Sequence, residues 1–480
     1  MRLTTKRWIR LLAGLVVAGL IAAACGGDDA DDATATAQPT TADTESASPP
    51  EESDESDDSD ASADDATTTP AAAADDEASG FTGTIRVIYV SPDFLGVPIE
   101  EDLEELRQQV PFEIETRQVN GWYGDLAQAV QREIAAGDVS DVAMMGLSNL
   151  RQFVEAGRVT PVTDLFAAEG SEFAAQYDSA FLDLMSADGE LYGMGYAYSN
   201  AVMYYNKDLF EAAGLDPESP PETWSEVVEA ARTIRAELGE DIVPITYPTG
   251  GDNWMFQTNL ASNGGSIMNA DETEFTFNDE AAVATVDFWR GLVEEGLMPV
   301  EGYDEMSERF FAGQQAMILH TIGAFGRVDS NVGDRFDWGT GLFPIPDDGS
   351  RQLAVGGSGF SIMTDDPERI EAAWTVLRHL AGPEAQANQA VSLGYMATNV
   401  AVAETSNADQ PWGLREYLDE EPRRQIAYIQ ASDSIPWYSA PRNNVEIDQI
   451  IVDAVDAALR GTGDTSEILD DAVARANELR

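Results

Sequence analysis

The sequence predicts an α/β fold in which parallel strands form sheets covered by helices on both faces. Two observations carry this prediction. From Thr84 onward, short apolar segments of strand length alternate with longer segments of helical periodicity, as expected for repeated strand–helix–strand units. Residues 197–205 are apolar and aromatic almost throughout, which is typical of one strand buried on both faces of a sheet.

In the first part of this region, three strands alternate with three helices. Ligands bind beyond the carboxyl ends of the strands in such sheets. The turns at 121–124 and 146–149, which follow the second and third strands, are therefore candidate binding segments. The expected elements are strands at 84–90, 112–119 and 141–145 and helices at 98–110, 125–136 and 150–156.

The second part begins with the buried strand at 197–205. Gly214 can end a short helix at 209–213, and Thr223 can cap a longer amphipathic helix. The remaining expected elements are a strand at 242–247, a loop with an aromatic tip at 250–254, a helix at 279–296, a helix and strand within 307–319, a helix opening at 321–326, and two last helices at 447–459 and 466–479.

The amino-terminal residues predict export and lipid attachment. Four basic residues precede an apolar run at 11–24, which is too short to anchor in a bilayer and fits a secretory signal. Cys25, the only cysteine, ends a stretch that resembles a bacterial lipobox, although Ala22 stands where leucine is usual. We expect residues 1–25 to be a signal peptide with a lipobox and Cys25 to be acylated, which would hold the exported protein at the outer face of the cytoplasmic membrane. An ordinary signal peptide that contains a cysteine is the alternative.

Composition sets further bounds on the protein. Residues 26–80 contain no lysine, arginine or aromatic residue, so we expect a disordered acidic tether that cannot bury enough apolar surface to fold. The whole chain has 87 acidic and 27 basic residues and a formal net charge of −60. Such a charge argues against binding to nucleic acid. A single cysteine excludes an intrachain disulfide.

One long segment carries a family resemblance. The run YYNKDLFEAAGLDPESPPETWSEVVEAA, residues 204–231, resembles the segment that enters the second lobe of family-1 solute-binding proteins of ABC importers. Further matches are FFAGQQAM at 310–317, GTGLFPIP at 339–346 and GYMATN at 394–399. The similarity covers nearly all of residues 81–480. Glycerol-3-phosphate-binding members are the most similar group, followed by sugar-binding members.

The resemblance implies a two-lobed periplasmic-binding-protein fold with hinge strands and a central ligand cleft. Lobe 1 would comprise residues 81–197 and 358–401, and lobe 2 would comprise residues 198–357 and 402–480. The implied function is that of a substrate-binding lipoprotein. It would capture a carbohydrate or glycerol-phosphate-type solute outside the membrane and deliver it to the ABC permease, and we expect it to act as a monomer.

Candidate ligand contacts follow from the resemblance. Trp122 and Tyr123 lie at a strand end, where aromatic rings can stack on a sugar; from the residues alone, a pair of core aromatic residues is equally acceptable. The guanidinium of Arg442 would suit a phosphate or carboxylate, whereas the residues alone favour a surface ion pair. The resemblance implies ligand contacts at Tyr123, Ser199, Trp254, Thr321, Gly357, Tyr395 and Arg442.

Three positions depart from the glycerol-3-phosphate-binding members. Leu147 stands where they carry a glutamate that binds ligand hydroxyls, Thr321 stands where serine is usual, and Gly251 replaces a second tryptophan. Ser148 or Asn149 could compensate for the missing glutamate. The ligand therefore stays open between glycerol 3-phosphate, a glycerophosphodiester and an oligosaccharide.

Enzyme motifs are largely absent from the sequence. His320 and His379 are expected to be structural, and no cluster of histidine and cysteine has metal-binding spacing. We predict a binding protein that is not an enzyme and needs no metal or cofactor. The alternative from another class is a secreted glycoside hydrolase acting on oligosaccharides through a pair of carboxylates. A surface lipoprotein without a ligand is a third possibility.

Overall fold

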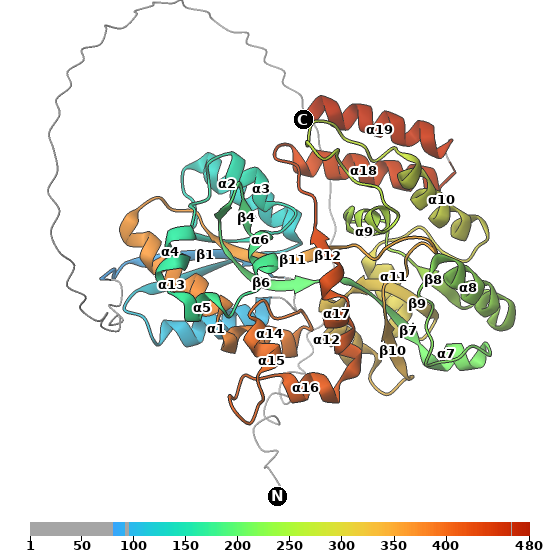
Figure 1. The fold of residues 1–480 in the computed structure, drawn as a ribbon, viewed down its shortest axis with the longest axis horizontal. Coiled ribbons are helices and arrows are strands. Elements are labelled where there is room, and N and C mark those ends of the chain that lie inside the picture. Colours follow the sequence, from blue (N-terminus) through green and yellow to red (C-terminus); the bar gives the residue numbers. More distant parts are fainter. Residues whose placement is uncertain (1–79, 92–95, 462) are drawn as a thin grey trace, which may run out of the picture. The chain divides into compact units, whose positions relative to one another are not determined.

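The computed structural model describes residues 80–91, 96–461 and 463–480, and Figure 1 shows their helices and strands coloured along the chain. The predicted signal peptide, the lipidation site Cys25 and the tether up to residue 79 lie outside the described residues. Within the described residues, no helix combines the length and apolarity needed to span a bilayer.

A six-stranded sheet is built around three parallel strands, as the sequence predicts. The long strand β11 pairs antiparallel with β3 along one edge and with β6 along the other, where β12 also joins it in parallel. All residues of β11 are buried, which is typical of a strand in a sheet that is covered on both faces. The strands are β1 (Thr84–Val90), β2 (Glu113–Val119), β3 (Val142–Gly146), β6 (Met194–Ser199), β11 (Leu353–Ile362) and β12 (Ser434–Pro436).

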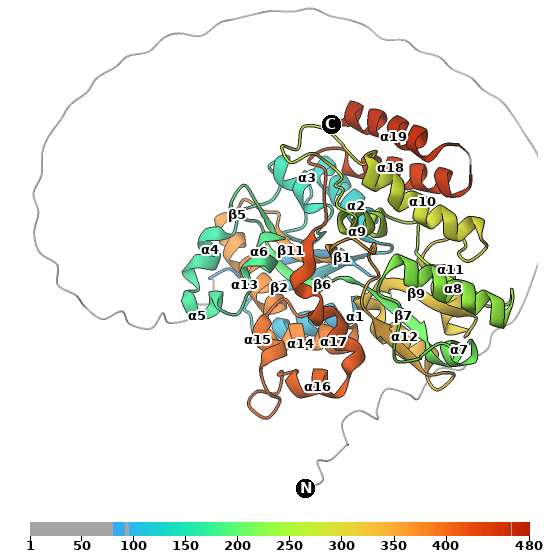
Figure 2. The ribbon, with the colours of Figure 1, turned by 45° about the vertical axis from the view of Figure 1, so that its right-hand side comes forward.

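Helices cover both faces of this sheet. α2 packs on one face, against β1, β2 and β3, whereas α1, α13 and α14 pack together on the other (Figure 1). Figure 2 shows the same separation of α2 from α1 and α14 in a turned view. The elements of this part and of its connections are α1 (Gly96–Arg107), α2 (Tyr123–Ala136), α3 (Leu150–Glu155), α4 (Thr163–Ala168), α5 (Ser171–Ala174), α6 (Ser179–Asp183), β4 (Ser186–Ala187), β5 (Glu190–Leu191), α13 (Pro367–Ala381), α14 (Pro383–Ser392), α15 (Val400–Glu404), α16 (Arg415–Glu420) and α17 (Pro422–Ile429).

A second sheet of four strands has the order β10-β7-β9-β8, with β7 antiparallel to both of its neighbours. Thr223 caps α8 through its side chain, as predicted. The elements here are β7 (Ala201–Asn206), α7 (Lys207–Ala212), α8 (Trp224–Leu238), β8 (Val243–Thr246), α9 (Trp254–Ser262), α10 (Glu280–Glu294), α11 (Tyr303–Phe311), β9 (Gln315–Thr321), the 3₁₀ turn η1 (Ile322–Ala324), α12 (Phe325–Val332), β10 (Trp338–Gly341), the 3₁₀ turn η2 (Ala431–Asp433), α18 (Asn444–Leu459) and α19 (Thr465–Leu479).

The single strand expected at 197–205 is wrong, because the structure divides this run into β6 and β7, which belong to different sheets. Asn200 separates them and is fully buried. Its side-chain amide donates to the carbonyl of Ala427 at 2.8 Å, and its side-chain oxygen accepts from Gln430 at 3.0 Å. Both strands are buried on both faces, so hydrophobicity gave no signal of the passage between sheets.

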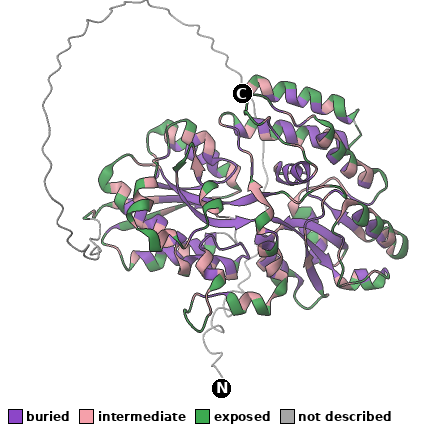
Figure 3. Cartoon of the chain, in the orientation of Figure 1, coloured by how far each residue is buried: buried purple, intermediate pink, exposed green. Residues whose placement is uncertain are grey.

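Several helix starts also differ from the sequence prediction, and two of these differences, at α2 and α9, concern the candidate binding residues. α2 begins at Tyr123 rather than at residue 125, and the side chain of Asp125 accepts from the backbone N–H of Trp122 at 2.9 Å. Trp254 is not an exposed loop tip, because it opens α9 and is buried. Figure 3 shows the general pattern: the strands are buried, and the helices turn exposed faces outward.

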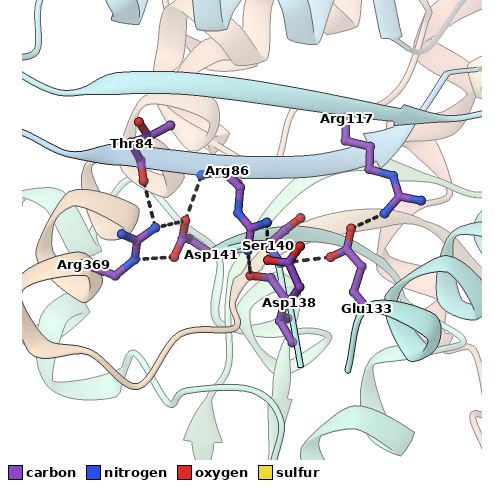
Figure 4. Close-up of polar contacts among 9 residues, drawn as sticks. Thr84, Arg86, Arg117, Glu133, Asp138, Ser140, Asp141 and Arg369 are labelled. Carbon is purple, nitrogen blue, oxygen red and sulfur yellow. Dashed lines mark hydrogen bonds and ion pairs between the residues drawn. The ribbon is translucent and has the colours of Figure 1, made fainter. Parts of the chain in front are cut away.

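At the amino end of the first sheet, ion pairs join strands to helices (Figure 4). Arg369 on α13 donates to both oxygens of Asp141, at 2.7 and 2.5 Å, and to the carbonyl of Thr84 at 2.8 Å. The backbone N–H of Arg86 donates to Asp141 at 2.8 Å, and its guanidinium pairs with Asp138 at 2.7 Å. These contacts fix α13 to β1 and to the residue that precedes β3.

Candidate functional site

A cavity of about 250 Å³ lies among strand ends of both sheets. Ser199 ends β6, Thr321 ends β9, and Gly356 and Gly357 belong to β11. Helices α2, α9, α11 and α18 contribute further lining residues. Trp122 and Ser148, which follow the carboxyl ends of β2 and β3, also line the cavity. Both lie in the segments that were predicted to bind a ligand, 121–124 and 146–149.

The structure brings together all the predicted contact residues except Arg442. The side chain of Arg442 is exposed, and the residue is not among those that line the cavity. The predicted residues that do line it are Trp122, Tyr123, Ser199, Trp254, Thr321, Gly357 and Tyr395.

Glycines allow the aromatic walls of the cavity to lie close to the backbone. A Cβ atom on Gly146 would come within 2.6 Å of the Tyr123 side chain, and one on Gly323 would come within 2.4 Å of the Tyr395 ring. At Gly357, φ is +119°, and a Cβ atom would lie 1.9 Å from the carbonyl oxygen of Ala197. Only glycine fits that position, because other residues rarely adopt this conformation and would collide with β6.

Two tryptophans form another wall. The indole N–H of Trp254 donates to the carbonyl of Ala354 at 2.7 Å, and that of Trp437 donates to the side-chain oxygen of Asn253 at 2.9 Å. The two rings are tilted, with centroids 6.1 Å apart. Because each indole nitrogen is already bonded, the rings offer their apolar surfaces to a ligand.

Two buried polar side chains are available in the cavity. Ser199 is 2% exposed, and within the described part of the chain its hydroxyl has no hydrogen-bond partner. His320 is 6% exposed, and its Nδ1 accepts from the backbone N–H of Thr321 at 2.8 Å. Nδ1 must then be unprotonated, so the neutral ring carries its hydrogen on Nε2. Burial, aided by the charge of Arg327, lowers the pKa of His320 to about 3, which keeps this neutral form at physiological pH.

Comparison with known proteins agrees with this geometry. Residues 103–415 match the family described as bacterial extracellular solute-binding protein. The chain belongs to this family. It is a substrate-binding protein of the ABC-importer class, as the sequence predicted, and the match gives no support to the glycoside hydrolase alternative.

Individual relatives of this solute-binding protein point the same way. The sn-glycerol-3-phosphate-binding periplasmic protein UgpB of Salmonella typhimurium is 27% identical over 342 residues, which cover 67% of this chain and 75% of that protein. UgpB from Mycobacterium tuberculosis, solved in complex with glycerophosphocholine, matches with a TM-score of 0.73 at 21% identity and covers 82% of this chain and 98% of that one. Lmo0181 from Listeria monocytogenes, solved with cycloalternan, gives a TM-score of 0.71 at 21% identity, covering 83% of this chain and 99% of that one. These two structures show the shared fold.

Leu147 of the solute-binding protein is buried away from the cavity lining. Its backbone N–H donates to the carbonyl of Gly357 at 3.1 Å. Ser148 and Asn149, the two residues considered as replacements for the absent glutamate, do line the cavity. Their side chains bond to each other at 3.2 Å, with the amide of Asn149 donating to the Ser148 hydroxyl.

Sequence reasoning missed several lining residues. His320 was taken as structural, and no motif singled out Tyr303 on α11, Arg327 on α12 or Trp437. Two acidic residues, Asp252 and Asp448, also reach the cavity. The only sequence signal for Asp252 was its place two positions before Trp254, which was predicted to contact the ligand. Asp448 lies in a helix that reads as ordinary amphipathic sequence, so nothing distinguished it from the other acids of the chain.

Proposed function

We propose that this protein captures a hydroxyl-rich solute, either a carbohydrate or a glycerol-phosphate-type molecule, and delivers it to an ABC permease. The observation that carries the proposal is the cavity itself, in which aromatic walls surround inward-facing polar groups. Aromatic surfaces stack on the apolar face of a sugar or polyol, and hydroxyl and imidazole groups can bond to its hydroxyls. The ligands of the relatives, which include sn-glycerol 3-phosphate and cycloalternan, fit this class.

The proposed mechanism is closure of two lobes around the solute. Ser199 and Gly357 belong to strands of one sheet, and Thr321 belongs to the other. A solute that contacts all three would stabilise the closed arrangement and shift the population toward it. The division into residues 81–197 with 358–401 and residues 198–357 with 402–480 stays a prediction.

We further propose that Cys25 is acylated, that residues 26–80 act as a tether, and that the protein works as a monomer without catalytic turnover. A Cys25→Ala variant should be released from membranes into the medium, whereas the natural chain should partition with the membrane fraction. Equal partitioning of both would argue against the lipid anchor.

The function can be tested by isothermal titration of the purified protein. The probes would be glycerol 3-phosphate, glycerophosphocholine, maltose, maltotriose and trehalose. Trp254→Ala and Tyr123→Ala should each weaken the binding probe by tenfold or more, about 1.4 kcal/mol, because each removes an aromatic wall.

Trp412→Ala is a matched control, because Trp412 packs in a small hydrophobic cluster apart from the cavity residues. The Trp412→Ala protein should bind the probe with the same affinity as the natural chain. If no probe binds, the proposed solute class is wrong. If both cavity variants bind as the natural chain does, Trp254 and Tyr123 are not part of the site.

A further inference from the structure

Two carboxyl groups line the cavity without a cationic partner. Asp252 lies in the loop before α9, and Asp448 lies on α18. Among the described residues, no ion pair joins either of them to a lysine, arginine or histidine. This is unusual for acidic side chains that are partly buried in a cavity, because charges removed from water are normally paired.

Neutral donors hold both groups in place. The backbone N–H of Trp254 donates to Asp252 Oδ1 at 3.0 Å, and the Tyr303 hydroxyl approaches the same oxygen at 3.4 Å. Asn253 donates to Asp448 Oδ1 at 2.7 Å, and Asn444 donates to Asp448 Oδ2 at 3.2 Å.

The orientation of Asn253 is fixed by its other contacts. Its side-chain oxygen accepts from Trp437 at 2.9 Å and from Gln257 at 2.8 Å. Its NH₂ group must therefore face Asp448. Because Asn253 follows Asp252 directly in the chain, this bond places Asp448 close to the backbone of Asp252, and the charge of Asp252 acts on Asp448.

The charges around the pair do not neutralise it. Tyr303 and Tyr438 are neutral, because burial raises the pKa of each, and His320 is neutral for the reason given above. Arg327 is the one permanent cation among the lining residues. Its guanidinium lies 3.7 Å from Asp304 and over the ring of Phe311, so it is already engaged elsewhere.

Burial acts on both carboxyl groups, and the charge of Asp252 also acts on Asp448. Burial raises the pKa of Asp252 to about 6. Burial and the charge of Asp252 raise the pKa of Asp448 to about 8. Near pH 7 the pair therefore keeps one proton and carries one negative charge, as expected when two acids share a site of low polarity.

We propose that Asp252 and Asp448 form a single acid–carboxylate pair that contacts the solute, selects a neutral hydroxyl-rich molecule over a phosphate monoester, and weakens capture when its last proton is lost. The inference rests on the proposed function and narrows its solute class. Within the cavity, the Ser199 hydroxyl, which has no hydrogen-bond partner among the described residues, and the Nε2–H of His320 are further groups available to solute hydroxyls.

The selectivity follows from charge and hydrogen bonding. A singly protonated pair can donate to one solute hydroxyl and accept from others. A phosphate monoester carries up to two negative charges, and an ionised carboxylate would repel them strongly in a site where water screens charges poorly. This repulsion would select against the phosphate monoester. Loss of the second proton removes the donor and adds a charge, so affinity for neutral solutes should fall above pH 8.

The binding experiment compares maltotriose, trehalose and glycerol 3-phosphate at pH 5.5, 7 and 9 by isothermal titration of the full chain. In the natural protein, a saccharide should bind at least tenfold more tightly than glycerol 3-phosphate at pH 7 and lose at least tenfold in affinity by pH 9. Asp448→Asn should remove most of that pH dependence. The double variant Asp252→Asn, Asp448→Asn should gain at least tenfold for glycerol 3-phosphate.

Asp453→Asn serves as the control, because Asp453 is an exposed acid on the same helix outside the cavity lining. Asp453→Asn should have the same affinity for each probe as the natural chain, with the same pH dependence. If glycerol 3-phosphate binds the natural protein at least as tightly as the saccharides and gains nothing in the double variant, the proposed selection is overturned.

A second measurement needs no ligand. A raised pKa in the folded state means that stability from this group is present at low pH and is lost as pH rises from about 4 to about 8. The Tm of Asp448→Asn relative to the natural chain should therefore increase between pH 5 and pH 9, and that of Asp453→Asn should not. If Tm depends on pH in the same way in the natural chain and in Asp448→Asn, the shared proton is overturned. If no probe binds but the two dependences of Tm on pH diverge, the proposed function and its solute selection fail, while the raised pKa of Asp448 is established.

Discussion

Acidic side chains have opposite surroundings at two places in the molecule. At the amino end of the first sheet, the Asp141 side chain is 4% exposed and receives two hydrogen bonds from Arg369 and one from the backbone of Arg86 (Figure 4). In the cavity, all the hydrogen bonds that Asp252 and Asp448 receive from the described residues come from neutral donors. The first arrangement compensates a charge fully, whereas the second leaves part of its charge uncompensated.

The difference separates a structural role from a binding role. A two-fold contact between arginine and carboxylate satisfies both groups and leaves nothing for a ligand. A carboxyl pair with only neutral donors instead retains lone pairs and a proton that a solute can use. Such a site costs stability in the unliganded protein, a trade common at functional sites. Variants that remove one partner at each place should therefore have different consequences.

The largest effect is expected for Arg369→Ala. Removing the guanidinium would leave Asp141 buried without its cation, and breaking such a pair typically costs about 3–5 kcal/mol. The loss would be measured as the decrease in the free energy of unfolding in urea. Solute affinity should not change, because neither Arg369 nor Asp141 lines the cavity.

Arg460→Ala gives the matched control for this variant. Arg460 pairs with Asp456 on the surface of α18 at 2.8 Å, and exposed pairs of this kind contribute only about 0.3–0.5 kcal/mol. An Arg369→Ala protein that loses no more stability than Arg460→Ala would show that the Asp141 pair is dispensable and would remove the contrast between the two places.

A smaller and pH-dependent effect is expected for Asp102→Asn. Asp102 on α1 is 7% exposed, accepts from Asn388 at 2.9 Å, and has a pKa that burial raises to about 7. Because the folded pKa lies above the unfolded value, the natural chain should lose stability from this group as pH rises from about 4 to about 7, on the order of 2–4 kcal/mol. Asp102→Asn should lack this loss when unfolding is measured across that range.

Asp102 also tests whether an unpaired acid must belong to the solute site. It does not line the cavity, so Asp102→Asn should leave solute affinity and its pH dependence unaltered. A change in affinity would mean that burial without a cation, rather than position in the cavity, governs the binding behaviour.

Much of the fold could be predicted because local patterns and tertiary structure agree. β1 occupies the residues expected for it, and Thr223 caps α8 as its sequence indicates. The division between β6 and β7 could not be predicted, because the deciding contacts of Asn200 reach Ala427 and Gln430. A buried strand and two consecutive buried strands have the same hydrophobic pattern.

The site could be predicted only where the family resemblance supplied positions. Tyr123, Ser199 and Trp254 were found in this way and do line the cavity. Asp448 was not found, because an acid in a chain with 87 acidic residues carries no signal by itself. Its role depends on Asn253, which lies 195 residues away in the chain and donates to it.

The smallest effect is expected for Arg442→Ala. The Arg442 side chain is exposed and lies outside the cavity lining, and exposed substitutions usually change stability by no more than about 0.5 kcal/mol. Isothermal titration with glycerol 3-phosphate and maltotriose should give Kd values within about twofold of the natural chain, whereas Arg327→Ala should alter both because Arg327 is one of the residues that line the cavity. A tenfold loss for glycerol 3-phosphate in Arg442→Ala would show that lobe closure carries this arginine to the solute. The site would then acquire a cation and come to resemble the compensated arrangement around Asp141.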